Sequence, residues 1–335
     1  MKSNDELEKV ELPALHQLQQ LGWQYIPGAV LSPESGERDY LRDVVLVKRL
    51  NASIKRLNPW ISDENLRKVS RLLTHPLQTG LIEYNQHLWE ILFGEGIAVD
   101  QDSNGTRRSQ TVTLIDHDNP DNNEFLCTNQ FKVAGVTQNI IPDILCFVNG
   151  LPLVVIECKS PYETDPINQG IDQLRRYANL RKPQDNEGAE KLFWYNQLMI
   201  STCRDNAKVG TISAASQHYG YWKDAYPFSD EDILAQLNAP LPASTDENMI
   251  REAGVPWFDS KASTTVTEVN PMQRMLAGMF NKKNFLDIVQ NFIIFELDDG
   301  KLIKKSARYQ QYRAVNKVIE QLKSCLLYTS PSPRD

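Results

Sequence analysis

The sequence predicts an α/β fold in which a mixed central sheet is flanked by helices, and three observations support this prediction. Apolar residues recur at helical spacing over much of residues 6–93, and short apolar runs separated by turn residues fill residues 97–159. A further helical pattern then stands between two strand-like runs. Hydrophobic residues make up 41% and charged residues 24% of the 335 residues, a globular composition that excludes disordered and fibrous chains.

The N-terminal part is predicted to be helical. Leucines follow helical spacing over residues 6–22, and Gly22 ends the pattern, as glycine commonly does at the end of a helix. The basic stretch 42–71 is also helical in pattern and suits either contact with phosphates or a solvated surface. A third helix is expected over residues 79–93.

The sheet is predicted from apolar runs that turn-forming residues bound. These runs give strands over residues 112–115, 125–133, 143–148 and 151–159. Pro166 then opens a helix over residues 166–181, capped by Thr164 or Asp165. Two more strands are expected over residues 192–202 and 210–214.

A domain boundary is predicted in residues 241–264, which are rich in Pro, Ala, Ser and Asp and show no periodicity. Residues 1–240 would form the N-terminal domain. Helical patterns over residues 271–280, 285–292 and 306–323 begin a second unit, residues 265–325. The last ten residues, 326–335, break the helical pattern and are expected to be a non-native tail.

The localisation predicted from the sequence is cytoplasmic, with no membrane contact. The N-terminus has no apolar signal region, no apolar run is long enough to cross a bilayer, and the five cysteines include no CxxC pair. The net charge of −7 means that any nucleic-acid contact must come from local basic patches or from partners.

Two acids and a lysine at the ends of apolar runs form the sharpest chemical pattern. Asp143 opens one run, and Glu157-Cys158-Lys159 closes the next. Glu157 and Lys159 are two residues apart on a strand, so they share one face. Two carboxylates and a lysine can hold Mg²⁺ and position a water against a phosphodiester. An ordinary ion pair at a sheet edge is the alternative.

The register between these two strands decides whether the acids meet. A two-residue turn at Asn149-Gly150 would pair Asp143 with Ile156 and leave Glu157 on the opposite face. A three-residue loop ending in Leu151, with a glycine bulge, would place Asp143 opposite Glu157 at about 5 Å. We predict the second register, because only this one allows a shared metal.

The helix over residues 166–181 carries a polar stripe. Gln169, Gln173 and Tyr177 recur every four residues, so their side chains lie on one face. They can bind phosphate or orient Lys159, although an ordinary solvated face gives the same pattern.

Five segments together carry a family resemblance. They are IIPDILCFVNGLPLVVIECKSP (140–161), QLRRY (173–177), LIDHDNPDNNEFLCTNQF (114–131), RLNPW (56–60) and GTISA (210–214). The chain resembles the PD-(D/E)xK nucleases, and more specifically the restriction (R) subunit of type I restriction–modification enzymes. The resemblance implies a PD-(D/E)xK core, a mixed central sheet with flanking and N-terminal helices, followed by the beginning of a superfamily 2 helicase domain.

The resemblance also implies roles for single residues. Asp143 and Glu157 would ligate Mg²⁺, with Mn²⁺ able to substitute, and the carbonyl of Cys158 would be a further ligand. Lys159 would be the catalytic lysine. The accessory pair of the family falls on Gln173 and Tyr177.

Two more residues are implied by position. Nucleases of this class often place another acid on the first core helix, and Glu83 is the candidate, with Glu90 as the second choice. The segment 308–315 resembles the region in which the helicase reads adenine through a glutamine, here Gln311, with Gln310 adjacent. No GxxxxGK[ST] phosphate loop occurs, so ATP is expected only in the full-length subunit.

The function implied by the resemblance is non-specific cleavage of double-stranded DNA after ATP-driven translocation by the full-length subunit. Modification (methyltransferase) and specificity subunits would be the partners. Two alternatives stay open. One is a catalytically silent module that docks the motor onto the methyltransferase, and the other is a repair or junction-resolving nuclease of the same fold.

Overall fold

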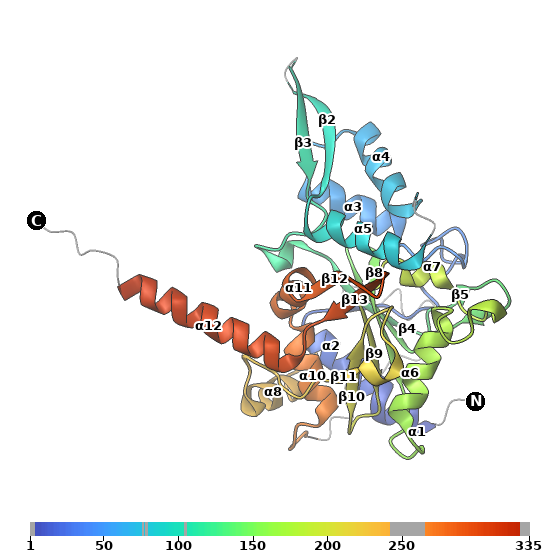
Figure 1. Cartoon of the computed structure of the whole chain (residues 1–335), viewed down its shortest axis with the longest axis vertical. Coiled ribbons are helices and arrows are strands. Elements are labelled where there is room, and N and C mark those ends of the chain that lie inside the picture. Colours follow the sequence, from blue (N-terminus) through green and yellow to red (C-terminus); the bar gives the residue numbers. More distant parts are fainter. Residues whose placement is uncertain (1–3, 76, 78–79, 104–105, 242–264, 329–335) are drawn as a thin grey trace, which may run out of the picture.

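The computed structural model describes the chain except residues 1–3, 76, 78–79, 104–105, 242–264 and 329–335. It confirms the predicted α/β class, with a central mixed sheet flanked by helices (Figure 1). The predicted linker, 241–264, and most of the predicted tail, 326–335, lie outside the described residues. Within the described residues, no helix is long and apolar enough to cross a membrane.

The central sheet has seven strands in the order β1-β4-β7-β8-β9-β10-β11. β4, β7 and β8 are antiparallel neighbours, and β8 and β9 are parallel, so the chain crosses over between them through helix α6 (Pro166–Tyr177). Every residue of β7, β8 and β9 is buried, as expected for strands covered on both faces. The strands are β1 Gln24–Tyr25, β4 Phe125–Asn129, β7 Ile144–Val148, β8 Leu151–Cys158, β9 Leu198–Thr202, β10 Ala207–Gly210 and β11 Gly220–Tyr221.

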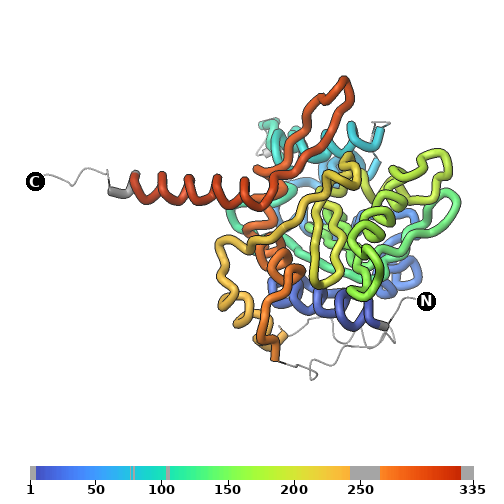
Figure 2. The backbone as a smooth tube through the Cα atoms, turned by 60° about the horizontal axis from the view of Figure 1, so that its bottom comes forward, coloured from blue at the N-terminus to red at the C-terminus, as the bar shows by residue number. Residues whose placement is uncertain are grey.

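Helices cover this sheet. α6 packs on β8 and β9, α2 packs on β1 and β4, and α10 packs on α2. Besides α6, the described residues form the α-helices α1 Asn4–Glu6, α2 Leu12–Gln20, α3 Val47–Leu57, α4 Asp63–Thr74, α5 Leu81–Phe93, α7 Glu190–Phe193, α8 Asp230–Leu237, α10 Pro271–Phe280, α11 Lys282–Asn291 and α12 Tyr309–Tyr328, and the π-helix η1 Leu7–Glu11. Short 3-10 helices lie at η2 Pro120–Asn122, η3 Pro183–Asp185 and η4 Ser216–His218. α12 and the tip of the hairpin formed by residues 293–306 extend away from the body (Figure 2).

Within the part of the chain that the structure describes, three short hairpins lie outside the central sheet. They are β2 Ile97–Ser103 with β3 Thr106–Val112, β5 Val133–Ala134 with β6 Asn139–Ile140, and β12 Ile293–Asp298 with β13 Lys301–Ser306. The strands predicted over residues 112–115 and 210–214 are wrong, because β3 ends and β10 ends where these ranges begin. The apolar residues that follow β3 are buried by packing and not by strand pairing.

The hairpin that carries the predicted acids closes through a two-residue turn. Asn149 and Gly150 have φ of 50° and 81°, as a type I′ turn requires. The predicted three-residue loop is therefore wrong.

The predicted register of these strands is nevertheless confirmed next to the acids. The ladder shifts by one residue between Cys146 and Phe147, which leaves Leu153 of β8 as the extra residue. Beyond this bulge Ile144 pairs with Ile156. One further step along that ladder places Asp143 opposite Glu157.

Gly150 is required by its surroundings as well as by its backbone. A Cβ atom there would lie 2.6 Å from the Leu46 carbonyl oxygen and 2.8 Å from the Leu50 nitrogen. Gly300, in the β12–β13 turn, has a similar φ of 73° but no atom within 4 Å of its Cβ position.

Gly150→Ala is therefore expected to cost several-fold more stability than the matched variant Gly300→Ala. The left-handed backbone alone costs an alanine roughly 1–2 kcal/mol, and overpacking at residue 150 adds about 1–3 kcal/mol. Urea unfolding of both variants measures the difference. Equal losses would contradict the close packing of this turn against α3.

The larger of two hydrophobic clusters joins residues from the N-terminal part to residues of α10 and α11. Trp23, beside β1, packs its ring against Phe125, Phe280 and Phe285 at centroid distances of 4.9, 5.7 and 5.3 Å. Its indole Nε1 donates to the Phe280 carbonyl at 2.8 Å. Helices α10 and α11 thus share their core with the N-terminal part.

Lys304 anchors the β12–β13 hairpin to the body. Its side chain is buried, and its ammonium donates to Asn85 Oδ1 at 2.7 Å, to the Asn196 carbonyl at 3.1 Å and to Gln197 Oε1 at 2.6 Å. Burial lowers the pKa of Lys304 well below its usual value of 10.5.

This lowered pKa predicts a pH dependence of stability. As pH rises above the folded-state pKa, the folded protein loses this proton while the unfolded chain keeps it up to about pH 10.5, so the free energy of unfolding rises. Urea unfolding between pH 7 and 10 should show wild type gaining stability relative to Lys304→Met. A difference that does not change with pH would contradict this prediction.

Candidate active site

The predicted acids and lysine meet at one end of β7 and β8. Asp143 directly precedes β7. Glu157 is the second-to-last residue of β8, and Lys159 directly follows that strand. Asp143 and Glu157 have no exposed surface, and Lys159 is 7% exposed. Buried charged groups of this kind persist only when they are paired or hydrogen-bonded.

Asp143 is held by the neighbouring strand. Its Oδ2 accepts the backbone N–H of Cys158 at 2.7 Å. The Cys158 side chain is buried, and its carbonyl faces the lysine. The contact fixes the Asp143 carboxylate beside the strand that carries Glu157.

Lys159 bridges the oxygen atoms of the site. Its Nζ donates to Glu157 Oε1 at 2.8 Å and to the Cys158 carbonyl at 3.0 Å, and it lies 3.8 Å from Glu6 Oε2. Burial lowers the pKa of Lys159, but Glu157 foremost, then Asp143 and Glu6, raise it further, so the net shift is upward. Lys159 is therefore a charged hydrogen-bond donor at neutral pH.

The accessory pair predicted on α6 lies beside this cluster. Gln173 Nε2 donates to Tyr177 Oη at 2.6 Å, and Tyr177 Oη donates to the Ile141 carbonyl at 3.2 Å. Burial, then the charge of Glu157, raises the pKa of the Tyr177 hydroxyl, so it stays protonated. The pair thus holds the segment just before Asp143. Gln169 is exposed and donates to the Thr164 carbonyl, away from this contact.

The acid that reaches the site from a helix is Glu6. Glu83 is exposed on α5, which packs on α7 and β13, so the structure does not bring Glu83 to Asp143 and Glu157. Glu90 is likewise exposed on α5. The expectation for Glu83 is corrected in this way. The acidic start of the first amphipathic helix was the signal that could have indicated Glu6.

The donor atoms of this cluster suit a hard cation. The carboxylates of Asp143 and Glu157 and the carbonyl of Cys158 are all oxygen donors, the class that Mg²⁺ prefers. Within the described residues, no three His, Cys, Asp or Glu side chains form a ready metal cage. A cation would therefore be held by two carboxylates and main-chain or water oxygens, which is usual for Mg²⁺.

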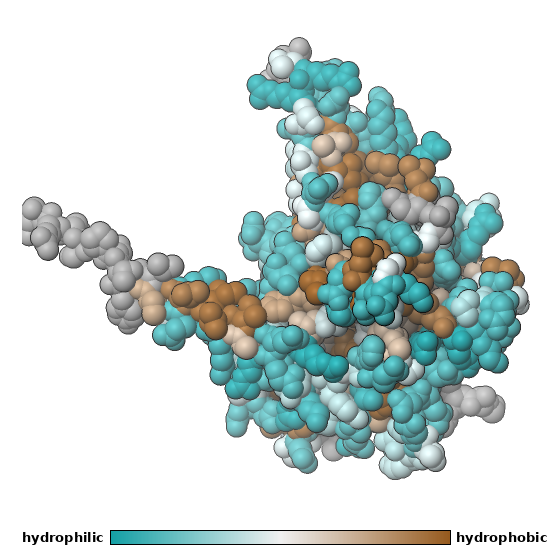
Figure 3. Space-filling model, in the orientation of Figure 1, coloured by the Kyte–Doolittle hydropathy of each residue, from teal (hydrophilic) through white to brown (hydrophobic). Residues whose placement is uncertain are grey.

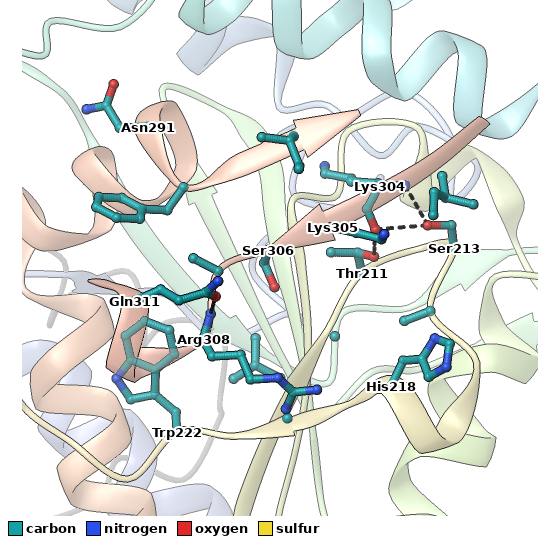
Figure 4. Close-up of a pocket in the computed structure, with 18 of the residues that line it drawn as sticks. Thr211, Ser213, His218, Trp222, Asn291, Lys304, Lys305, Ser306, Arg308 and Gln311 are labelled. Carbon is teal, nitrogen blue, oxygen red and sulfur yellow. Dashed lines mark hydrogen bonds between the residues drawn. The ribbon is translucent and has the colours of Figure 1, made fainter. Parts of the chain in front are cut away.

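Gln311 lies at a separate pocket of about 830 Å³ (Figure 4). The pocket is formed by the β12–β13 hairpin, the start of α12 and the β10–β11 region, and Trp222 and Arg308 contribute to its wall. Gln311 Oε1 accepts the backbone N–H of Arg308 at 2.8 Å, so the side chain caps the start of α12. Adenine readout by Gln311 stays a prediction.

Comparisons with known proteins identify related sequences. Residues 3–218 match the family described as type I restriction enzyme R protein N terminus (HSDR_N). The chain is 31% identical over 316 residues to the type I restriction enzyme HindI endonuclease subunit of Haemophilus influenzae, covering 93% of this chain and 26% of that protein. It is 27% identical over 329 residues to the putative type I restriction enzyme MjaIXP endonuclease subunit of Methanocaldococcus jannaschii, covering 97% and 28%. The chain thus spans about a quarter of the length of these relatives.

Proposed function

The chain belongs to the family of type I restriction enzyme R protein N termini, and we propose on that basis that it is the Mg²⁺-dependent endonuclease part of such a subunit. It would hydrolyse phosphodiester bonds of double-stranded DNA without reading the bases. One observation carries the proposal: two fully buried carboxylates meet at one end of β7 and β8, where Glu157 accepts a hydrogen bond from a charged lysine and Asp143 accepts one from the Cys158 N–H. An ordinary structural ion pair needs only one acid for one lysine.

The proposed roles follow from the contacts. Asp143, Glu157 and the Cys158 carbonyl would hold Mg²⁺, which supplies an activated water and neutralises phosphate charge when bound. Lys159 would donate hydrogen bonds to the non-bridging phosphate oxygens and stabilise their growing negative charge. Glu157 foremost, then Asp143 and Glu6, raise the pKa of Lys159, which supports a role as a protonated hydrogen-bond donor.

Three further residues would support this site. Gln173 and Tyr177 hold the segment before Asp143 through the Ile141 carbonyl, and so keep the carboxylate in place. Glu6 Oε2 lies 3.8 Å from Lys159 Nζ. Glu6, and not the predicted Glu83, would therefore be the additional acid of the site.

The larger reaction would need the full-length subunit. We propose that ATP-driven translocation comes from that subunit, with Gln311 near the adenine, and that modification and specificity subunits complete the complex. α12 supports the presence of a partner, because it exposes an apolar stripe (Figure 3) made of Val315, Val318, Ile319 and Leu322. The same stripe favours the alternative that the chain only docks the motor onto its partners.

Nicking of supercoiled plasmid tests the proposal. The unaltered chain should nick in Mg²⁺ or Mn²⁺, and Asp143→Asn should lose this activity by about 10²-fold or more, because one ligand charge is gone. Asp185→Asn, an exposed aspartate in the 183–185 turn, is the matched control and should nick normally.

The outcomes separate the candidate functions. Equal nicking by the unaltered chain and by Asp143→Asn would contradict the site. An inactive chain that still binds modification and specificity subunits would favour the docking module. A repair or junction nuclease would cleave branched DNA far better than linear duplex.

A further inference from the structure

We infer that Gln130 is a positioning residue of this site, and that it ties the N-terminal helix to the segment that carries Asp143. The inference rests on the proposed nuclease function for its meaning, but the two contacts that Gln130 itself makes involve neither the lysine nor a metal. Gln130 follows β4 directly, at the same end of the sheet as Asp143.

The first contact is made by the Gln130 side chain. Its Nε2 lies 3.3 and 3.2 Å from the two carboxylate oxygens of Glu11, and Asn129 Nδ2 donates to Glu11 Oε1 at 2.8 Å. Glu11 has no exposed surface. Two side-chain amides therefore solvate a carboxylate that water does not reach.

The Asn129 amide links Glu11 to a third residue. The Tyr25 hydroxyl donates to Asn129 Oδ1 at 2.8 Å. The Glu11 carboxylate only accepts hydrogen bonds, so it takes the amide nitrogen and leaves the amide oxygen for the Tyr25 hydroxyl. Strands β1 and β4 and helix η1 thus meet in one polar network.

The second contact is made by the Gln130 main chain. Its N–H donates to the Asp143 carbonyl at 3.3 Å, and its φ is 54°, in the left-handed region that costs a residue with a side chain roughly 1–2 kcal/mol. Such a conformation persists only where neighbouring contacts impose it, and it clusters at functional sites. One residue therefore touches the Asp143 segment with its backbone and Glu11 with its side chain.

The helix geometry carries this contact on to Lys159. Glu6 and Glu11 are five residues apart, which in an α-helix would separate them by about 140° around the axis. The segment between them is the π-helix η1, in which the Leu12 N–H donates to the Leu7 carbonyl, five residues back. The wider turn brings Glu6 and Glu11 toward one face, so that fixing Glu11 also places Glu6 beside Lys159.

The test replaces the amide without changing the size of the side chain. In the 335-residue chain, Gln130→Met should speed amide hydrogen exchange of residues 7–12 by about 10-fold, because Glu11 loses one of the two amides that hold it and keeps only the Asn129 amide. It should also raise the Mn²⁺ concentration for half-maximal plasmid nicking by about 10- to 100-fold, the usual cost of losing an outer-shell partner. Gln184→Met, at an exposed position, is the matched control and should change neither value.

A swap separates positioning from simple loss of packing. Gln130→Glu alone sets two carboxylates against each other and should behave like Gln130→Met. Adding Glu11→Gln restores one amide and one carboxylate, and it should restore both the exchange rates and the Mn²⁺ requirement. The inference is overturned if Gln130→Met exchanges like wild type in residues 7–12, or if the swap fails to restore these values.

The nuclease proposal can fail separately. If the unaltered chain does not nick plasmid, the proposed function is lost. The exchange rates of Gln130→Met and of the swap still decide whether Gln130 holds the helix.

Discussion

Replacing Lys159 with Met should slow plasmid nicking by about 10²- to 10³-fold, the usual effect of removing one preorganised charged donor. Lys159 donates to Glu157 Oε1 and to the Cys158 carbonyl, and it is nearly buried, so no water-exposed side chain can replace its charge. Met keeps most of the volume of the side chain. The measurement is single-turnover nicking of supercoiled plasmid in saturating Mn²⁺.

Two comparisons make this prediction specific. Lys182→Met, at an exposed position, should nick like wild type. Lys159→Arg keeps the positive charge and should retain more activity than Lys159→Met. Nicking by Lys159→Met within twofold of wild type would show that the lysine serves only as a structural counter-ion.

The pKa of Lys159 gives the same prediction a pH signature. Since the pKa is raised above 10.5, Lys159 keeps its proton through the neutral range, and the wild-type rate should show no rise attributable to its deprotonation between pH 6 and 9. A rise that disappears in Lys159→Arg would instead identify the lysine as the base.

Trp23→Ala should lower the free energy of unfolding by about 3–5 kcal/mol, the range for removing a large aromatic side chain from a core. The indole ring contacts three phenylalanines from both ends of the chain, and its Nε1 satisfies the Phe280 carbonyl. Both interactions are lost in the variant, and a cavity remains. Urea unfolding followed by far-UV circular dichroism measures the change.

The control is Tyr40→Ala, because Tyr40 is 59% exposed and its loss should cost no more than about 0.5 kcal/mol. Trp23→Phe should lie between the two. The shared core also requires that the unaltered chain unfold in one transition. Separate transitions for the N-terminal part and for α10–α11 would contradict that shared core.

The sequence allowed the site strands to be predicted because their pattern is unusual. Acids at the ends of fully apolar runs are costly unless they are paired, which draws attention to Asp143 and Glu157. The register that pairs them was predicted because only that register allows the two acids to share a metal. The same reasoning could not find the bulge at Leu153. A bulge residue in a buried strand is as apolar as its neighbours, so the extra residue leaves no trace in the pattern.

Other parts of the site lack a local signal. Five residues of α-helix would place Glu6 and Glu11 about 140° apart around the axis. Their shared face depends on the π-helix η1, so it could not be predicted from their spacing in the sequence. Helical spacing predicts α5 as the first core helix and so points to Glu83, whereas the structure places Glu6 of α1 beside Lys159. The β12–β13 hairpin is not among the predicted elements, although Asp299-Gly300 is a strong turn signal and the hairpin lies between two segments predicted to be helical.

The packing of Trp23 against Phe280 and Phe285 also limits how early the protein can complete its core during synthesis. The hydrogen bond between Trp23 and Phe280 spans 257 residues of sequence. At about 5–20 residues per second, the ribosome needs on the order of tens of seconds to add that length. Throughout this interval the nascent N-terminal part presents an indole ring without its two C-terminal phenylalanine partners. Chaperones that bind exposed aromatic residues should therefore engage this chain until residue 285 has emerged.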